Sequence, residues 1–332
     1  MTPTAADRHD LLVFTHPACA DHDPSPGHPE QPARLAAAMA AFKHPALVTC
    51  PVEMAPLASR EQLCLAHDPD HVERVWHAGE SGRRVQLDPD TAVASGSLTA
   101  ARHAAGAVIA GVDAVLGGRT RQVFCAVRPP GHHASAAQAM GFCQFNSIAI
   151  GARHAIHSHG LKRVAIVDFD VHHGNGSQAI FWRDPAVLVV SSHQWPLYPG
   201  SGRADETGSH DNIVNLTLPA GTGSAAFRQA WQQQALPRID AFAPELILVS
   251  AGFDGHADDP LASFELSEDD YHWLTGELNA LAARHAGGRL VSALEGGYHL
   301  AALSACVQAH ALALRGLPLS PMQLQAGDPG RG

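Results

Sequence analysis

The stretch VDFDVHHGNG, Val167–Gly176, places two aspartates and two histidines at the end of an apolar segment. Valine, isoleucine and alanine dominate the residues before it, which is typical of a buried strand. Carboxylates and imidazoles are costly to bury unless a hydrogen-bond partner or a metal ion satisfies them. The stretch therefore predicts a buried strand that ends at a polar site.

Five other apolar segments resemble the one that leads into this stretch. They are nearly continuous in Val, Ile, Leu and Ala, a pattern typical of strands buried on both faces of a parallel sheet. Helical patterns separate them. The six expected strands are 11–14, 122–127, 163–170, 186–193, 246–254 and 289–297.

Three helices are expected from periodicity and from their end signals. An apolar stripe from Leu98 to Val115 steps by three and four residues, and Gly117 and Gly118 end it. Ser267 and Asp270 form a capping box at the start of the second helix, and the third spans 300–316.

The alternation of strands and helices predicts an α/β fold: one doubly wound, mainly parallel sheet with helices on both faces. No linker or composition shift divides it, so we expect a single domain over residues 10–316. The ends, 1–9 and 317–332, are expected to be flexible.

Composition narrows the class of protein. Of the 332 residues, 45% are hydrophobic and 16% charged, which is enough for a large core. A net charge of -10 disfavours nucleic acid as a partner and suits cationic substrates, although acidity also serves solubility alone. No apolar run is long enough for a membrane span and no signal peptide is evident, so a soluble, cytoplasmic protein is expected. The six cysteines form no C-x-x-C pair and are expected to be reduced.

Histidine is abundant, with 23 residues, so adjacent pairs need caution. Chance alone predicts roughly 1.6 adjacent pairs at this composition. The pairs His132–His133 and His172–His173 therefore carry meaning only through their surroundings.

Each of the two histidine pairs lies just beyond the end of an expected strand, and two further strands also end in polar segments. In a parallel α/β sheet, ligands bind beyond the carboxyl ends of the strands. Polar residues follow four of the six strands here, and we expect them to meet at one rim. The four segments are Arg128–Ala134, Asp168–Gly176, Ala251–Pro260 and Glu295–Tyr298.

Asp170 and His172 are candidate metal ligands, because side chains two residues apart share one face of a strand. Asp254 from another strand end would complete a set of two carboxylates and one imidazole. Three protein ligands leave a position open, as in catalytic zinc sites. An isolated D-x-H is more often a hydrogen-bonded pair, but the neighbouring strand ends favour a metal site.

His132 and His133 follow Pro129–Pro130, which makes a rigid loop, a good mount for a general base. Tyr298 follows two glycines and is a candidate donor to an oxyanion. A surface loop histidine and a helix-capping tyrosine are the alternatives.

Taken in order, these motifs resemble those of histone deacetylases, and specifically a class II histone deacetylase-like amidohydrolase of the bacterial and acetylpolyamine amidohydrolase kind. Asn175 and Glu295 favour class II. The resemblance extends from about residue 12 to residue 315. Its motifs are HPEQPARL (28–35), RPPGHHA (128–134), GFCQFN (141–146), VDFDVHHGNG (167–176), SAGFDGHADDPL (250–261) and LEGGY (294–298).

The resemblance implies an arginase–deacetylase fold and hydrolysis of an N-acyl amide. It implies one Zn²⁺ held by Asp170, His172 and Asp254. His133 would be the general base and then the acid, His132 against Asp168 would supply charge, Asn175 would orient His133, and Tyr298 would donate to the oxyanion.

The resemblance also implies a substrate tunnel and a structural K⁺ site. Phe142 and Tyr198 would wall the tunnel, Leu261 would line its mouth, and Asp90 would sit at its rim. The carbonyl of Gly141 would accept the substrate N–H. The full substrate set is Gly141, Phe142, Tyr198, Leu261, Gly297 and Asp90; the potassium set is Asp168, Asp170, His172, Ser191 and Ser192.

Three functions stay open from the sequence. The first is a zinc-dependent deacetylase acting on acetyl-lysine, acetylpolyamines or longer acyl amides, with no membrane or nucleic-acid partner. An arginase-like dimanganese hydrolase would need a D-A-H-x-D run, which is missing. A non-catalytic acyl-lysine binder would not need the full set of metal ligands, histidines and tyrosine. The natural substrate, the oligomeric state and the choice of zinc, iron or cobalt are not determined.

Overall fold

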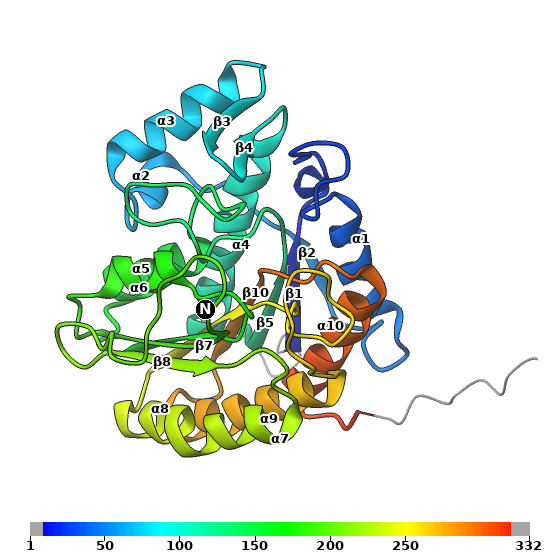
Figure 1. The fold of residues 1–332 in the computed structure, drawn as a ribbon, viewed down its shortest axis with the longest axis vertical. Helices are drawn as coiled ribbons and strands as arrows, with labels where there is room; N and C mark the ends of the chain where they lie inside the picture. The colour runs from blue at the N-terminus through cyan, green and yellow to red at the C-terminus, as the bar shows by residue number, and fades with distance from the viewer. Residues whose placement is uncertain (1–8, 320–332) are drawn as a thin grey trace, which may run out of the picture.

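The computed structural model describes residues 9–319. Eight strands form one sheet in which every neighbouring pair is parallel (Figure 1). The order across the sheet is β2-β1-β5-β10-β9-β6-β7-β8. The strands are β1 (His9–Thr15), β2 (Val52–Met54), β5 (Thr120–Ala126), β6 (Val164–Asp168), β7 (Val187–Gln194), β8 (Ile213–Leu218), β9 (Leu246–Ala251) and β10 (Leu290–Leu294). A separate antiparallel hairpin joins β3 (Val85–Asp88) to β4 (Thr91–Val93).

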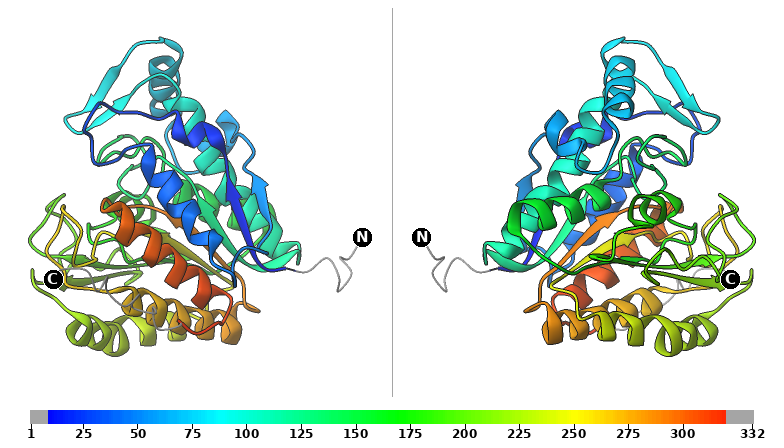
Figure 2. Two further views of the ribbon diagram at one scale, coloured as in Figure 1. Left: turned by 90° about the vertical axis from the view of Figure 1, so that its right-hand side faces the viewer. Right: turned by 90° about the vertical axis from the view of Figure 1, so that its left-hand side faces the viewer.

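Helices cover both faces of the sheet (Figure 2). One face packs against α1 (Ala33–Ala40), α7 (Ser224–Ala230), α8 (Leu236–Phe242), α9 (Glu268–His285) and α10 (Leu300–Leu314). The other packs against α2 (Arg60–Leu63), α3 (Pro69–Glu80), α4 (Ser97–Leu116), α5 (Ser147–His159) and α6 (Asn175–Phe181).

The strand residues explain this layering. In β1, Leu11 and Val13 join one core cluster, whereas Leu12 and Phe14 join the other. Successive side chains of a strand point to opposite faces, so a strand between two helical layers needs apolar residues at every position. The predicted doubly wound, mainly parallel sheet is confirmed.

The two strands of the main sheet that the sequence missed, β2 and β8, lie at its edges. Two half-buried positions interrupt the buried residues of β8, and β2 has only three residues, so neither shows a continuous apolar run. Three predicted strands also extended too far, because β6 ends at Asp168, β9 at Ala251 and β10 at Leu294. The polar residues beyond those ends form loops.

The predicted long helices are present as α4, α9 and α10. The backbone N–H of Ser267 donates to Asp270 Oδ2 at 3.0 Å, as expected from the capping box. Most of the predicted flexible ends lies outside the described residues. The structure does describe a few residues of these ends. His9 begins β1, and the carbonyl of Leu317 is 2.8 Å from His272 Nε2. None of the helices between residues 9 and 319 is both long enough and apolar enough to cross a membrane.

The four strands with polar ends are β5, β10, β9 and β6, and they are consecutive in the centre of the sheet. Because they are parallel, their carboxyl ends lie side by side. The four loops that follow these strands therefore meet at one edge of the sheet and form its rim.

Candidate active site

Three possible metal ligands meet beyond the ends of β6 and β9. The ligand atoms of Asp170, His172 and Asp254 lie within 4.8 Å of one another. His172 Nδ1 is 3.3 Å from Asp170 Oδ1 and 3.0 Å from Asp254 Oδ2. Both carboxylates are 1% exposed. The sequence-predicted ligands therefore come together in a buried cluster.

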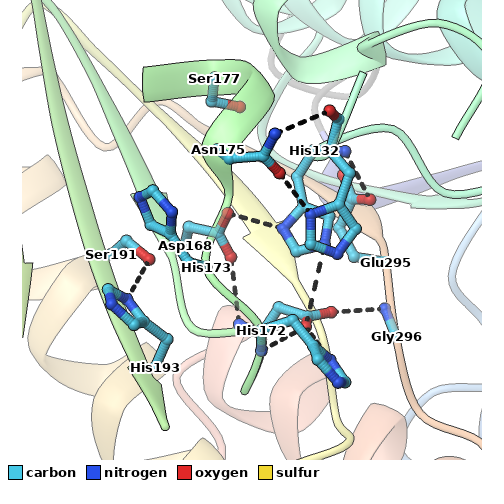
Figure 3. A network of polar contacts seen from close by, with 12 residues as sticks. His132, Asp168, His172, His173, Asn175, Ser177, Ser191, His193, Glu295 and Gly296 are labelled. Carbon is cyan, nitrogen blue, oxygen red and sulfur yellow. Dashed lines mark hydrogen bonds and ion pairs between the residues drawn. The ribbon is translucent and has the colours of Figure 1, made fainter. Parts of the chain in front are cut away.

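The other oxygen of each carboxylate is held by the backbone. Asp170 Oδ2 accepts the N–H of Gly296 at 2.8 Å, and Asp254 Oδ1 accepts the N–H of Val171 at 2.9 Å. Figure 3 shows the approach of Gly296 to this cluster. Each carboxylate thus keeps one oxygen facing the imidazole.

Two glycines make room for the cluster. A Cβ at Gly252 would lie 2.0 Å from Asp170 Oδ2, and one at Gly296 would lie 2.2 Å from Asp254 Oδ2. Real Cβ atoms do not approach so closely, so glycine is required at both positions. The loops are shaped around the two carboxylates.

The charges in the cluster favour a cation. Burial, followed by the charge of Asp170, raises the pKa of Asp254 to about 7. Burial lowers the pKa of His172, but hydrogen bonds to Asp170 and Asp254 outweigh it and raise that pKa to about 10. Two buried carboxylates and one imidazole leave an unbalanced negative charge that a divalent metal ion would neutralise. The donor set fits such an ion.

One prediction about this cluster is wrong. Asp170 and His172 were expected to share the face of a strand, but β6 ends at Asp168 and both residues lie in the following loop. The loop folds back so that the N–H of His172 donates to Asp170 Oδ1 at 2.9 Å. This local turn, and not strand alternation, aligns the two side chains.

The two histidines of the proline loop have different partners, which Figure 3 shows in part. His132 Nδ1 is 2.9 Å from Asp168 Oδ2, and His133 Nδ1 is 2.8 Å from Asn175 Oδ1. An amide oxygen only accepts, so His133 donates through Nδ1 and its Nε2 carries the lone pair. Both rings are buried, in contrast to the alternative of surface loop histidines.

Protonation separates the pair further. Burial lowers the pKa of His132, but the charges of Asp168 and Asp170 outweigh it and raise that pKa well above its usual range. Burial, followed by the charge of His132, holds the pKa of His133 well below its usual range. His132 is therefore an imidazolium and His133 a neutral imidazole.

Glu295 fixes the loop that carries these histidines (Figure 3). Its Oε2 accepts the N–H of Gly131 at 2.6 Å and that of His132 at 3.1 Å. Burial raises the pKa of Glu295 to about 7, although the positive charge of His132 opposes this. One carboxylate from the end of β10 thus anchors the loop after β5.

A cavity of about 210 Å³ opens onto the cluster. It brings together His133, His172 and Tyr298 with five of the six predicted substrate residues. The exception is Gly297, which does not line it; the carbonyl of Gly297 accepts Arg34 Nε at 2.6 Å instead. The lining residues are Asp90, His133, Gly141, Phe142, His172, Leu197, Tyr198, Leu261 and Tyr298.

The wall of the cavity is built on an unusual backbone. Gly141 and Phe142 both have positive φ, 57° and 69°. Asp90 and Thr91 hold this turn, because their Oδ1 and Oγ1 accept the N–H groups of Gly141 and Phe142, each at 2.9 Å. Positive φ is costly for a phenylalanine and is commonest at functional sites. Asp90 therefore lines the cavity and, through its hydrogen bond to Gly141, also stabilises the turn that forms the cavity wall.

Of the predicted potassium residues, Asp168, Ser191 and Ser192 lie in the paired strands β6 and β7, whereas Asp170 and His172 lie in the loop after β6. Asp168 is in register with Ser191. The hydroxyl of Ser191 is 3.0 Å from His193 Nδ1 (Figure 3), whereas the buried hydroxyl of Ser192 has no hydrogen-bond partner. An orphaned buried oxygen at this position is compatible with a cation.

Sequence reasoning missed a buried ion network behind the site. Glu30 pairs with Arg34 at 3.0 Å and with Arg128, and all three side chains are fully buried. The guanidinium of Arg34 also lies 4.8 Å from the ring centroid of Tyr298. The only signal was the i, i+4 spacing of Glu30 and Arg34 in HPEQPARL, which gives no indication of what the arginine contacts.

A parallel α/β sheet whose rim holds a buried metal-ligand set and a neutral histidine at the base of a cavity is the arrangement of a hydrolytic enzyme. Residues 28–314 match the histone deacetylase domain. The chain is similar to the solved HDA15 HD domain, with 34% identity, a TM-score of 0.87 and coverage of 94% of this chain and 89% of that one. The chain therefore belongs to the histone deacetylase family and is a deacetylase-type hydrolase.

Three curated relatives illustrate the range of the family. The histone deacetylase-like amidohydrolase of Pseudomonas aeruginosa is 43% identical over 76% of this chain and 67% of its own length. The polyamine deacetylase HDAC10 of Mus musculus is 39% identical over 88% of this chain but only 46% of its own length. The chain spans 21% of the type-2 histone deacetylase 2 of Dictyostelium discoideum, which is 35% identical.

Proposed function

We propose that this chain is a zinc-dependent deacetylase that hydrolyses the acyl amide of acetyl-lysine or a related acylated amine to acetate and the free amine. The observation that carries this proposal is the pairing of a neutral, Asn175-oriented His133 with a buried two-carboxylate, one-imidazole set at the base of one cavity.

Asp170, His172 and Asp254 would hold the Zn²⁺, which when bound polarises the acyl carbonyl and lowers the pKa of water. Zinc is favoured over magnesium or calcium because one of the three ligands is an imidazole. The remaining steps fall to side chains of the rim.

His133 is the general base, because its Nε2 is free to take the proton of the attacking water. The same nitrogen then returns the proton to the leaving amine. His132 stays protonated beside Asp168, and burial together with the charge of His132 keeps His133 neutral between turnovers. Tyr298 lines the cavity, and its hydroxyl donates to the oxyanion that develops on the substrate carbonyl.

The substrate class follows from the lining of the cavity. Phe142, Leu197, Tyr198 and Leu261 provide a largely apolar wall, and Asp90 is the one carboxylate among the lining residues. Such a wall suits the aliphatic stem of an acylated lysine. The polyamine deacetylase relatives favour an acylpolyamine as the second candidate, with Asp90 as the group nearest to its distal cation.

We also propose a structural K⁺ at Asp168, Asp170, His172, Ser191 and Ser192, supported by the unpaired hydroxyl of Ser192. A cytoplasmic location is proposed from the free thiols of Cys19, Cys64, Cys125, Cys143 and Cys306. We expect a small acylated amine or peptide as the partner, and neither nucleic acid nor a membrane.

The test is turnover of a fluorogenic acetyl-lysine peptide by the purified chain, with chelator and after addition of Zn²⁺. We expect chelation to abolish activity and zinc to restore it. A panel of acetyl-lysine, longer acyl-lysines and acetylpolyamines, ranked by kcat/KM, then identifies the substrate class. Absence of turnover with zinc, iron(II) or cobalt(II) on every substrate would instead support a non-catalytic acyl-amine binder.

A further inference from the structure

A second cluster of metal-ligating side chains lies away from the active site, on the helices α4 and α5 (Figure 1). It consists of Asp113 from α4 and of His154 and His159 from α5. The Nε2 atoms of both histidines are 2.7 Å from Asp113 Oδ1. Of the described residues, only these three and the active-site trio form such a group.

The position of this cluster in the fold is electrostatically favourable for a cation. The helix α4 leads into β5 and α5 leads into β6, and both strands belong to one parallel sheet. Both helices therefore run in the same direction and end at the edge opposite the catalytic rim. Asp113 and His159 lie in the last turns of their helices, where the macrodipoles place partial negative charge. A carboxylate between two such ends is unfavourable alone and favourable beside a metal ion.

The helices are packed closely enough to hold the three ligands together. A Cβ at Gly151 would lie 2.5 Å from Val108 Cγ1, so glycine allows α5 to approach α4 one turn before the cluster. His154 is 9% exposed and Asp113 has a half-exposed side chain, which leaves the cluster open to solvent on one side. The backbone positions are fixed, while the carboxylate is free to adjust.

The distances require only a small adjustment for metal binding. Bonds of about 2.0–2.1 Å in tetrahedral geometry place two ligand atoms about 3.3 Å apart. The separations of 2.7 Å between Asp113 Oδ1 and each Nε2 are those of hydrogen bonds, so the exposed carboxylate would have to withdraw from each imidazole by less than about 1 Å. The two Nε2 atoms lie within 4.8 Å of each other.

A second contact prepares one of the imidazoles. His154 Nδ1 is 3.2 Å from the hydroxyl of Ser158. A ligating histidine usually donates its other N–H to a neighbouring acceptor, which fixes the ring and the tautomer. When a metal ion replaces the proton on Nε2, Ser158 can accept the Nδ1 proton of His154, so that the lone pair of Nε2 is left for the ion.

We propose that Asp113, His154 and His159 form a second metal site, for a divalent transition metal ion of the Zn²⁺ class, that clamps the C-terminal ends of α4 and α5 together. Two imidazoles and one carboxylate are a donor set for zinc, cobalt or nickel and not for calcium or magnesium. Water completes the coordination on the exposed side. The site is structural, since it lies across the sheet from the catalytic rim.

The test measures the zinc content of wild-type and variant proteins after loading with excess Zn²⁺ and gel filtration in metal-free buffer. The variants are His159→Gln and Asp113→Asn. The matched control is His285→Gln: His285 Nε2 is also 2.7 Å from an aspartate, Asp240 Oδ1, but Arg284 occupies the place of the second imidazole. The readout is the difference in zinc content between wild type and each variant. This difference does not depend on how much zinc the catalytic site retains.

We expect wild type and His285→Gln to retain one equivalent of zinc more than His159→Gln and Asp113→Asn. In titrations, the affinity for that equivalent should fall at least tenfold in both cluster variants, and the rise in melting temperature that accompanies it should disappear. Deacetylase activity should not change. Equal zinc content in all four proteins, or an equal loss in the control, would overturn the proposal.

Discussion

At the scale of single residues, two tyrosines allow the effect of a hydroxyl in the cavity to be compared with that of a hydroxyl in the core. Tyr298 lines the cavity, whereas the hydroxyl of Tyr271 is buried without a hydrogen-bond partner. We expect Tyr298→Phe to lower kcat by roughly 10²–10³-fold, as for the loss of one oxyanion donor, with little change in KM. The ring contacts with Arg34 and Phe142 persist in phenylalanine.

Tyr271→Phe is the matched control, since it removes the same atom from a buried site. Steady-state kinetics on one acetyl-lysine peptide should show wild-type kcat for this variant. If Tyr298→Phe retained kcat within fivefold of wild type, its hydroxyl would not be the oxyanion donor.

Gly141 tests how closely the cavity wall approaches His133, the proposed general base. A Cβ at this position would lie 2.2 Å from His133 Cδ2. Gly141→Ala should therefore displace His133 and lower kcat/KM by about 100-fold, because such misplacement is costly in catalysis. Gly27→Ala is the control: Gly27 also has positive φ, 78°, but has nothing within 4 Å of its Cβ position. Similar activities in the two variants would contradict this account of the wall.

At the scale of elements, three segments far apart in sequence are locked by one ion network. Glu30 lies just before α1, Arg34 reaches the backbone after β10, and Arg128 begins the loop after β5. Burial tends to raise the pKa of Glu30, but His22 and the two arginines outweigh it and hold that pKa well below its usual range. The network couples the first helix to the loops after β5 and β10.

Glu30→Gln removes the charge without removing volume and leaves two buried guanidinium groups without their counter-charge. We expect this change to lower the free energy of unfolding by about 3–5 kcal/mol, measured by urea denaturation. Asp205→Asn breaks the exposed pair with Arg203 and should give no measurable change. Equal effects of the two substitutions would mean that the buried network does not stabilise the fold.

The same elements show what sequence reasoning can reach. The central strands could be predicted because burial on both faces demands continuous apolar residues. The rim could be predicted because parallel strands bring their carboxyl ends together. The edge strands β2 and β8 could not, since half-buried strands lack a continuous apolar run.

Contacts between distant segments were also out of reach. Arg34 and Gly297 are 263 residues apart, and nothing in either segment indicates that they meet. The turn that aligns Asp170 with His172 depends on side-chain to backbone hydrogen bonds, which residue spacing does not reveal. The candidate ligands could be named from residue type, but their mutual geometry required the fold.

At the scale of the whole molecule, buried neutral histidines make stability depend on pH. Burial lowers the pKa of His67 and of His310 to about 3. His67 Nε2 accepts the N–H of Asn146 at 2.8 Å, so a proton there would break a buried hydrogen bond. His310 lies between the hydroxyls of Thr275 and Ser292, at 2.7 and 2.9 Å. Its ring packs against Phe169 and Phe253, in the core beneath the rim.

The sign of the effect follows from proton binding. An unfolded histidine has a pKa of about 6.5, so between about pH 6.5 and 3 the unfolded chain binds a proton that the folded chain does not. Stability therefore falls as the pH drops through that window, by about 2 kcal/mol per histidine at pH 5. We expect His310→Gln, which cannot titrate, to lose about 2 kcal/mol less than wild type between pH 7.5 and pH 5. Urea denaturation with chelator present keeps metal release out of the comparison. An equal decline in both proteins would show that His310 does not carry this share of the acid sensitivity.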